Sequence, residues 1–203
     1  MYAFKPLSQG LAEGPLKTLE KVWSVAMDPD APKEQVHRFN GNKKESPVNI
    51  YGMPVVVGGL IYVASGGDLF WGKNEATVQA IDGNGKLVWK TPVKNHVIGT
   101  PAVKDGLLYI ADCGRGMHCI DAATGAVVWE DEIKGEAWAS PMVADGKVYL
   151  GTRSGDFYVW STGREKKLLH SLKFPAPISG TVSVANGRLY VASMTTLYSF
   201  GLK

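Results

Sequence analysis

Short apolar runs alternate with glycine-centred turn pairs along most of this chain. In four places a tyrosine stands three residues after the last glycine of such a pair, and successive tyrosines are 47, 40 and 41 residues apart. Asn-Gly, Asp-Gly and Gly-Gly pairs favour two-residue hairpin turns, because both central residues of those turns need positive φ. The pattern therefore predicts four equivalent β-hairpins, which contain Tyr62, Tyr109, Tyr149 and Tyr190.

Each hairpin begins a unit that reads as four strands. In the unit around Tyr109, the expected strands are Ala102–Lys104, Leu107–Ala111, Met117–Asp121 and Val127–Glu130. No stretch shows sustained helical periodicity with capping residues, so we expect an all-β chain. Four-stranded units with a period of about forty residues are typical of a β-propeller, whose sheets bury both faces against their neighbours.

The repeat divides the chain into successive sheets, the blades of the predicted propeller. Residues 1–25 are expected to hold the third and fourth strands of one blade. Three complete blades are expected at residues 53–91, 100–131 and 140–172, and the first three strands of another at 181–200. The chain therefore reads as a single propeller domain, or part of one, with about four to four and a half blades.

Large aromatic residues recur at one place in the repeat. Trp89 and Trp129 end the fourth strand of two units, and Trp23 holds the matching place in "KVWSV", so we expect all three to pack between blades. In the third complete unit, Leu168 is expected where the tryptophan would stand.

The segments "TPAVKDGLLYIAD", "SPMVADGKVYLGTRSGDFYV" and "DAATGAVVW" resemble the PQQ-like (quinoprotein-type) propeller repeat. That family includes the quinoprotein dehydrogenases and BamB-like proteins of the bacterial envelope. The resemblance implies that Trp89 and Trp129 are docking residues that lock adjacent blades. It also implies a ring of about seven or eight blades, of which this chain would be the C-terminal portion. Two alternatives are closure of this chain into a four-bladed ring, and a homodimer in which two chains complete one ring.

Composition and charge narrow the choice of partners. The chain has 203 residues, with 22 Lys and Arg against 19 Asp and Glu and a net charge of +3. The basic residues are scattered, so we expect no nucleic-acid partner. No apolar run approaches the length of a membrane-spanning helix. The opening "MYAFKPLSQG" lacks the regions of a signal peptide, so we expect no export signal in this sequence.

The two cysteines, Cys113 and Cys119, flank the turn between two expected strands. The alternation places Cys119 nearer to Ala111 than to Cys113, so we expect two half-buried free thiols rather than a disulfide. Without a clustered histidine or further cysteines, they also make a poor zinc site, and no metal site is expected.

One face of the predicted propeller is the first candidate for binding. The longest interruptions of the repeat, Ala26–Gly52 and Ser65–Ala76, both fall on connections that emerge at that face. The second carries Phe70 and Trp71 at an expected hairpin tip, where exposed aromatics suit a protein or carbohydrate contact.

Residues that precede the first strand of each blade should ring the mouth of the central channel on the same face. The candidates are Asn49, Tyr51, His96, Glu136 and Trp138. Asn, His and Glu side chains around a channel could bind a metal or a polar ligand.

Two arginines in neighbouring turns, Arg115 and Arg153, should point to this face as well. Arg153 stands opposite Asp156 across its turn, and this spacing predicts a cross-strand ion pair.

The resemblance permits two classes of function. We favour a non-catalytic scaffold without a cofactor, which displays loops to a protein partner in the bacterial envelope; by resemblance it would be periplasmic or otherwise exported. No catalytic motif, phosphate-binding glycine loop or metal-spaced cluster stands in the sequence. The alternative is part of a dehydrogenase that binds pyrroloquinoline quinone and Ca²⁺, which requires oxygen ligands and a carboxylate base.

The dehydrogenase alternative lacks two expected features. The family's dehydrogenases commonly carry two adjacent cysteines, whereas Cys113 and Cys119 are separated in sequence, and Asn49 with Glu136 alone make an incomplete calcium set. A third reading is a carbohydrate-binding propeller that uses its exposed aromatics, namely Phe70, Trp71 and Trp138.

Overall fold

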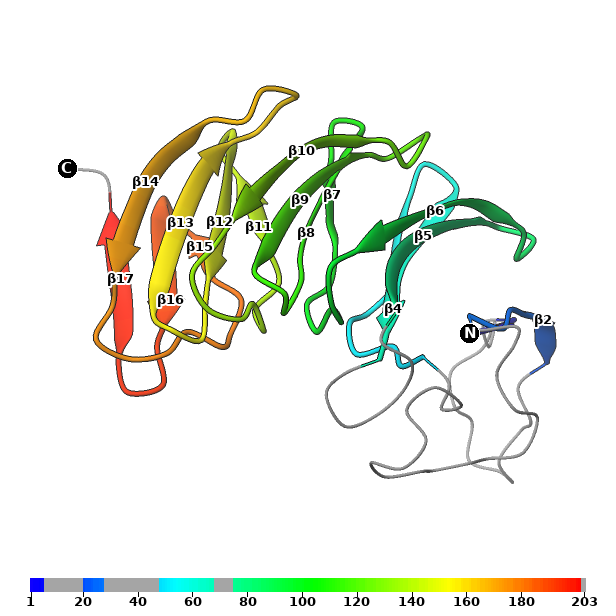
Figure 1. Ribbon diagram of the computed structural model, residues 1–203, viewed down its shortest axis with the longest axis horizontal. Coiled ribbons are helices and arrows are strands. Elements are labelled where there is room, and N and C mark those ends of the chain that lie inside the picture. Colours follow the sequence, from blue (N-terminus) through cyan, green and yellow to red (C-terminus); the bar gives the residue numbers. More distant parts are fainter. Residues whose placement is uncertain (6–19, 28–47, 68–74, 202–203) are drawn as a thin grey trace.

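The computed structural model describes residues 1–5, 20–27, 48–67 and 75–201 of the chain (Figure 1). Every regular element in these ranges is a β-strand, so the predicted all-β fold is confirmed for them. The strands form five antiparallel sheets, and within each sheet they follow one another in chain order. Much of the two long connections, with Phe70 and Trp71, lies outside the described residues.

Three sheets have four strands each. Their strands are β3 (Val55–Val57), β4 (Leu60–Gly66), β5 (Ala76–Asp82) and β6 (Leu87–Val93); β7 (Ala102–Lys104), β8 (Leu107–Ala111), β9 (Gly116–Asp121) and β10 (Val127–Glu132); and β11 (Met142–Ala144), β12 (Lys147–Gly151), β13 (Asp156–Ser161) and β14 (Leu168–Lys173).

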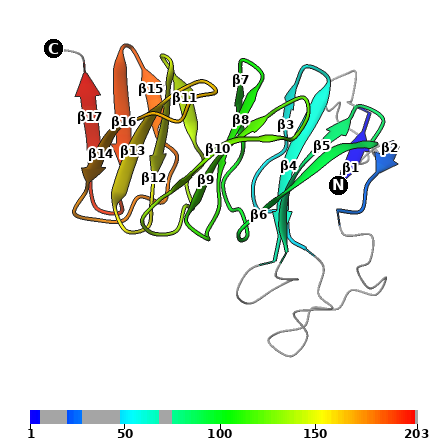
Figure 2. The same cartoon turned by 45° about the horizontal axis from the view of Figure 1, so that its top comes forward.

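Two further sheets have fewer described strands. The first sheet consists of β1 (Tyr2–Phe4) and β2 (Lys21–Ser24), and the last consists of β15 (Ser183–Ala185), β16 (Arg188–Ala192) and β17 (Leu197–Gly201). The five sheets stand side by side in chain order, with β1–β2 at one end of the row and β15–β17 at the other (Figures 1 and 2).

The turn between the first two strands is the same in four sheets. Both of its central residues have positive φ, as the two-residue turn requires. The pairs are Gly58 and Gly59 (60° and 80°), Asp105 and Gly106 (50° and 73°), Asp145 and Gly146 (48° and 64°), and Asn186 and Gly187 (51° and 70°).

The hydrophobic core lies between neighbouring sheets rather than in one central mass. One cluster joins Tyr109 and Trp129 of the β7–β10 sheet to Val148, Leu150 and Trp160 of the next sheet. Equivalent clusters fill the adjoining interfaces. Neighbouring sheets therefore bury apolar side chains against one another.

Three tryptophan side chains cross from one sheet to the next. Each donates its indole N–H to a carbonyl in the turn between the third and fourth strands of the next sheet: Trp23 to Gly83 at 2.8 Å, Trp89 to Ala122 at 2.9 Å and Trp129 to Gly163 at 3.0 Å. A Cβ added at Gly125 would lie 2.6 Å from the Trp89 ring, so the indole requires glycine there.

The third complete sheet has no tryptophan at this place, and its register corrects one expectation. Trp129 pairs with Cys119 on the preceding strand, and the matching pair one sheet later is His170 with Val159. Leu168 lies beyond a register shift in the same pairing, so the expectation that it holds the tryptophan position is wrong. His170 holds that position and is exposed.

A row of hydroxyl groups links the segments that lead into the first strands. In each case a backbone N–H of one sheet donates to a hydroxyl of the next. The Met53 N–H donates to Thr100 Oγ1 at 3.0 Å, the Thr100 N–H to Ser140 Oγ at 2.8 Å, and the Ser140 N–H to Thr181 Oγ1 at 3.0 Å. Each hydroxyl thus accepts a bond from the preceding sheet, which fixes the spacing between neighbouring sheets.

Candidate binding face

The connections that carry the candidate residues meet at one end of the sheets. In three sheets, the carbonyl of a residue before the first strand accepts the N–H of a residue after the second strand. The pairs are His96 with Cys113, Glu136 with Arg153 and Pro177 with Met194, each at 2.9 Å. These bonds fix the two kinds of connection to one another, so their side chains share a surface, here called the connection face.

The first group of side chains on the connection face comprises Asn49, Tyr51 and His96. The amide of Asn49 donates to the Tyr51 hydroxyl at 3.2 Å, and the Tyr51 ring meets the His96 ring edge-on at 6.2 Å. Tyr51 is 43% exposed, whereas His96 is buried with its Nδ1 2.9 Å from Asn95 Oδ1. Tyr51 is therefore the most exposed member of this group.

The second group is organised around Trp138, which is 41% exposed. Its indole N–H donates to Glu136 Oε2 at 3.0 Å, and the Arg153 guanidinium lies 4.4 Å from its ring centre. Arg153 also donates to Ser179 Oγ at 2.8 Å and approaches Met194 Sδ at 3.3 Å. An aromatic ring, a cation and a thioether are thus held together by residues of two adjacent sheets.

The position of Arg153 corrects the expected ion pair with Asp156. The partners of Asp156 are instead Lys173 at 2.9 Å and the Ser154 hydroxyl. Burial alone would raise the pKa of Asp156, but the bonds from Ser154 and Lys173 outweigh it and lower that pKa. Sequence spacing did not identify Lys173, because it reaches Asp156 from the neighbouring strand β14.

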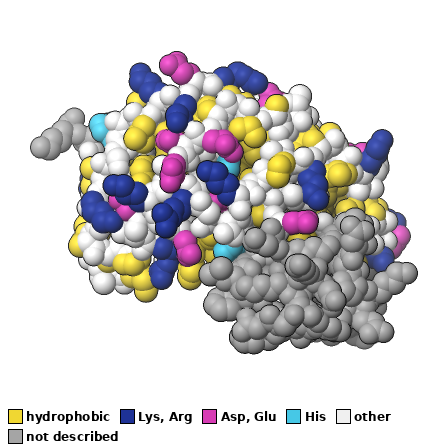
Figure 3. Space-filling view, viewed as in Figure 1, with side chains coloured by type: hydrophobic (Ala, Val, Ile, Leu, Met, Phe, Trp, Pro, Cys, Tyr) yellow, Lys and Arg dark blue, Asp and Glu magenta, His cyan; other side chains and the backbone are white. Residues whose placement is uncertain are grey.

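The surface charge is mixed. On the side of the molecule that Figure 3 shows, Lys and Arg side chains of the described residues are interspersed with Asp and Glu, and hydrophobic side chains lie among them. Mixed charge of this kind makes no single-sign patch on the surface shown.

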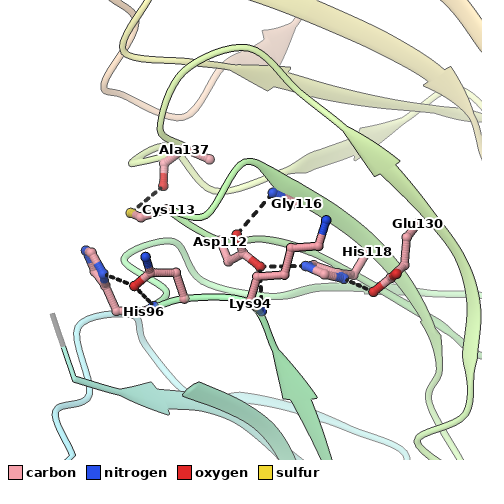
Figure 4. Close-up of polar contacts among 9 residues, drawn as sticks. Lys94, His96, Asp112, Cys113, Gly116, His118, Glu130 and Ala137 are labelled. Carbon is pink, nitrogen blue, oxygen red and sulfur yellow. Dashed lines mark hydrogen bonds and ion pairs between the residues drawn. The ribbon is translucent and has the colours of Figure 1, made fainter. Parts of the chain in front are cut away.

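A buried polar cluster near the connection face was not predicted from the sequence (Figure 4). The His118 ring is 1% exposed, with Nε2 2.8 Å from Asp112 Oδ2 and Nδ1 2.8 Å from Glu130 Oε1. Asp112 is fully buried and also accepts the backbone N–H groups of Lys94 and Gly116, at 3.1 and 3.0 Å. The cluster thereby ties the turn after β8 to strands β9 and β10.

The sequence did carry a signal for this cluster. His118 is a polar residue inside the apolar strand β9, and Asp112 directly follows the apolar strand β8. Side chains of this kind are buried only with hydrogen-bonding partners, so each one predicts the other.

Neither cysteine forms a disulfide, and both are buried. The Cys113 thiol contacts the carbonyl of Ala137 at 3.5 Å (Figure 4). Cys119 pairs with Tyr109 on β8, two residues from Ala111 along that strand. Burial raises the pKa of the Cys119 thiol from 9.0 to about 12, so this thiol stays neutral at physiological pH.

Asn49 and Glu136, the two residues considered for a calcium set, lie in different groups on the connection face. The Asn49 amide and the Glu136 carboxylate each bond an aromatic side chain of their own connection, at Tyr51 and Trp138. Among the described residues, no group of three or more His, Cys, Asp or Glu side chains is placed to hold a metal ion. No helix in the same ranges is long and apolar enough to cross a membrane.

Consecutive four-stranded antiparallel sheets, packed face to face and joined by repeated indole bonds, define a β-propeller built from PQQ-like repeats. The family model for outer membrane protein assembly factor BamB matches residues 17–112, 74–166 and 118–200. The chain belongs to this family.

Solved structures share the fold at low sequence identity. BamB from Moraxella catarrhalis is similar with a TM-score of 0.63 and 18% identity, over 77% of this chain and 47% of that chain. The computationally designed Ika8 protein gives a TM-score of 0.65 and 12% identity, over 91% and 50%. The quinohemoprotein alcohol dehydrogenase ADHIIG from Pseudomonas putida HK5 gives 0.55 and 17%, over 71% and 28%.

These likenesses concern the fold alone. The chain spans about half the length of the Moraxella BamB chain, at 47% coverage. A comparison with curated proteins gave no match.

Proposed function

We propose that this chain is a non-catalytic scaffold module of the bacterial envelope, which binds a protein partner through its connection face. The observation that carries the proposal is the exposed Trp138, fixed between the Arg153 guanidinium and the Glu136 carboxylate. Tryptophan, tyrosine, methionine and arginine are enriched where proteins bind one another. A ring already held in place loses little conformational freedom on binding.

Two further exposed side chains extend this surface along the row of sheets. Tyr51 lies before β3 and is 43% exposed, and Met194 follows β16 and is 66% exposed. Together with Trp138 they offer apolar contacts at three of the successive sheets. The family supports a partner in the envelope, since its model is described as an outer membrane assembly factor.

The carbohydrate alternative is less well supported by the geometry of Trp138. Sugars stack on an open aromatic face, and Arg153 lies over this ring at 4.4 Å. Phe70 and Trp71 lie outside the described residues, so their contribution stays a prediction from the sequence.

Quantitative capture from an envelope extract tests the proposal. The tagged protein is compared with the double variant Tyr51→Ala, Trp138→Ala by mass spectrometry of the bound proteins. Loss of two exposed anchors at an interface should reduce capture of a specific partner by about tenfold or more. The fold should persist, because neither side chain is buried.

The matched controls shorten exposed apolar side chains that lie elsewhere on the same chain. Val127→Ala and Leu168→Ala, both at residues 47% exposed, should leave capture unchanged. Equal loss in these controls, or undiminished capture by the double variant, would contradict the proposal. Capture by the double variant Phe70→Ala, Trp71→Ala tests the expected hairpin tip in the same way.

The dehydrogenase alternative has its own test. Pyrroloquinoline quinone with Ca²⁺ is added while the melting temperature and dye-linked dehydrogenase activity are followed. The scaffold proposal predicts neither a shift nor turnover, because ligand binding to the folded state alone would raise the melting temperature. Clear stabilisation together with turnover would overturn it.

A further inference from the structure

Positive charge predominates in the connections of the connection face that are described along their whole length. These connections are residues 94–101, 112–115, 133–141, 152–155, 174–182 and 193–196. Their basic residues, here called the cation row, are Lys94, Arg115, Lys134 and Arg153. The same segments contain the carboxylates of Asp112 and Glu136 only.

Neither of these two carboxylates neutralises the cation row. Asp112 is fully buried and accepts bonds from His118 and from two backbone N–H groups. Glu136 Oε2 accepts the indole N–H of Trp138 at 3.0 Å. Among the described residues, no member of the cation row forms an ion pair.

The opposite end of the sheets differs in this respect. There Lys147 lies 2.7 Å from Asp145, and Arg164 lies 2.8 Å from Asp121. Cations near those turns already have counter-charges within the chain. The cation row is instead available to the carboxylates of another molecule.

The members of the cation row follow one another from sheet to sheet. Lys94 lies beside the glycine that precedes Arg115, where an added Cβ would be 3.0 Å from the Lys94 Cβ. The carbonyl of Arg115 accepts the N–H of the residue before Lys134 at 3.0 Å. The carbonyl of Lys134 accepts the hydroxyl of the residue after Arg153 at 3.0 Å. The row therefore crosses three neighbouring sheets.

Within the row, Arg153 has a side chain that its neighbours hold in place. Its Nη1 donates to Ser179 Oγ at 2.8 Å, and its guanidinium lies 4.4 Å from the centre of the Trp138 ring. Its Nε and Nη2 make no hydrogen bond to any described residue. A guanidinium presents its donors in a planar fork that matches a carboxylate, so this half-buried side chain is oriented in advance for one.

We propose that the cation row binds an acidic segment of the protein partner, with one carboxylate on Arg153 and others on Lys134 and Arg115. This inference rests on the proposed function, to which it adds the chemistry of the partner. Trp138 and Met194 lie beside Arg153 and offer apolar contacts to the same segment. Solvent screens the charge of a half-buried guanidinium less than that of an exposed lysine, so Arg153 should contribute most.

A protein segment fits this row better than an anionic membrane does. Attraction to a membrane sums over many basic residues spread across a surface. The net charge of the chain is only +3, and the side shown in Figure 3 carries acidic residues among the basic ones. A narrow row that ends at a fixed aromatic ring matches a single extended chain.

Binding of defined peptides tests the proposal. Fluorescence anisotropy compares a labelled peptide of alternating Glu and Leu with one in which Gln replaces each Glu. The acidic peptide should bind about tenfold more tightly, and about 0.5 M NaCl should reduce the difference, because salt screens exposed charges. Arg153→Gln should weaken its binding by about tenfold, and the double variant Arg115→Gln, Lys134→Gln, at exposed positions, by about threefold.

Arg164→Gln is the matched control, because it removes a guanidinium that Asp121 already neutralises, and it should leave peptide binding unchanged. The proposal would be overturned by equal affinity for the two peptides, by no binding of either, or by undiminished binding to both row variants. Tighter binding to phosphatidylglycerol vesicles than to the acidic peptide would overturn it in favour of a membrane. If the peptide test fails while Tyr51→Ala, Trp138→Ala still loses partner capture, this inference fails and the proposed function stands.

Discussion

At the scale of single residues, the tryptophans that cross between sheets combine a hydrogen bond with a large buried ring. Trp89 and Trp129 are 8% and 7% exposed, and each ring lies about 6 Å from a tyrosine of its own sheet, at 6.0 Å between centroids in both cases. Each of these junctions therefore contains one tryptophan that both packs and donates a hydrogen bond across it.

Replacement of such a ring should lower the stability of the fold. We expect Trp129→Ala to lower the free energy of unfolding by about 3–5 kcal/mol, because it leaves a cavity and removes the bond to Gly163. Urea denaturation measures the loss. His170→Ala is the matched control at the equivalent exposed position, and its cost should stay below about 0.5 kcal/mol. Similar losses for both variants would contradict a special role for the indole.

The Cys119 thiol makes stability depend on alkaline pH. Its pKa is about 12 in the folded chain against 9.0 when solvated, so the unfolded chain ionises first as pH rises. The folded state then binds more protons than the unfolded state, and its stability is complete below pH 9 and falls as pH approaches 12. Denaturation midpoints across this range should fall less steeply for Cys119→Ala than for the native chain. An equal slope would contradict the assignment.

At the scale of elements, the sequence identified the hairpins because their turns depend on local chemistry. Asp105-Gly106 and Asp145-Gly146 need only their own backbone preferences, and both adopt the expected positive φ. The register of β14 could not be read in the same way. The turns before the fourth strands differ in length, and the pairing shifts by a residue within each strand pair, so His170 rather than Leu168 meets the tryptophan position.

Side-chain partners from other strands were harder to predict than turns. Asp156 finds Lys173 on β14, and His118 finds Glu130 on β10, because pairing brings residues together that are distant in sequence. Of the candidate binding residues, the structure joins Asn49, Tyr51 and His96 in one group and Glu136 with Trp138 in another. The sequence placed these positions in equivalent connections but could not show that His96 is buried.

The His118 cluster should stabilise the β7–β10 sheet. His118→Ala leaves the fully buried Asp112 carboxylate without its main side-chain partner, which should cost about 3–5 kcal/mol in unfolding free energy. Glu130→Ala should cost clearly less, because the Glu130 side chain is 48% exposed and water can replace it at the ring. Chemical denaturation of both variants measures the difference. Equal losses of unfolding free energy in the two variants would show that the buried Asp112 carboxylate is not the cause of the loss in His118→Ala.

At the scale of the whole molecule, repetition provides a row of sheets, and the connections at one end of their strands form the connection face. The indole bonds and the hydroxyl row repeat from sheet to sheet and are therefore parts of the framework. Trp138 with Arg153 and Glu136 occurs once among the described residues. A rigid framework that fixes an exposed aromatic side chain suits partner binding.

Photo-cross-linking in cells tests whether a partner binds the connection face. A photoreactive phenylalanine analogue replaces either Trp138 on the connection face or Asp105, whose side chain is 78% exposed in a turn at the opposite end of the sheets. A partner bound at the connection face should give a discrete protein adduct from position 138 and none from position 105. Adducts of equal yield from both positions, or adducts from position 105 alone, would contradict a partner-binding role for the connection face.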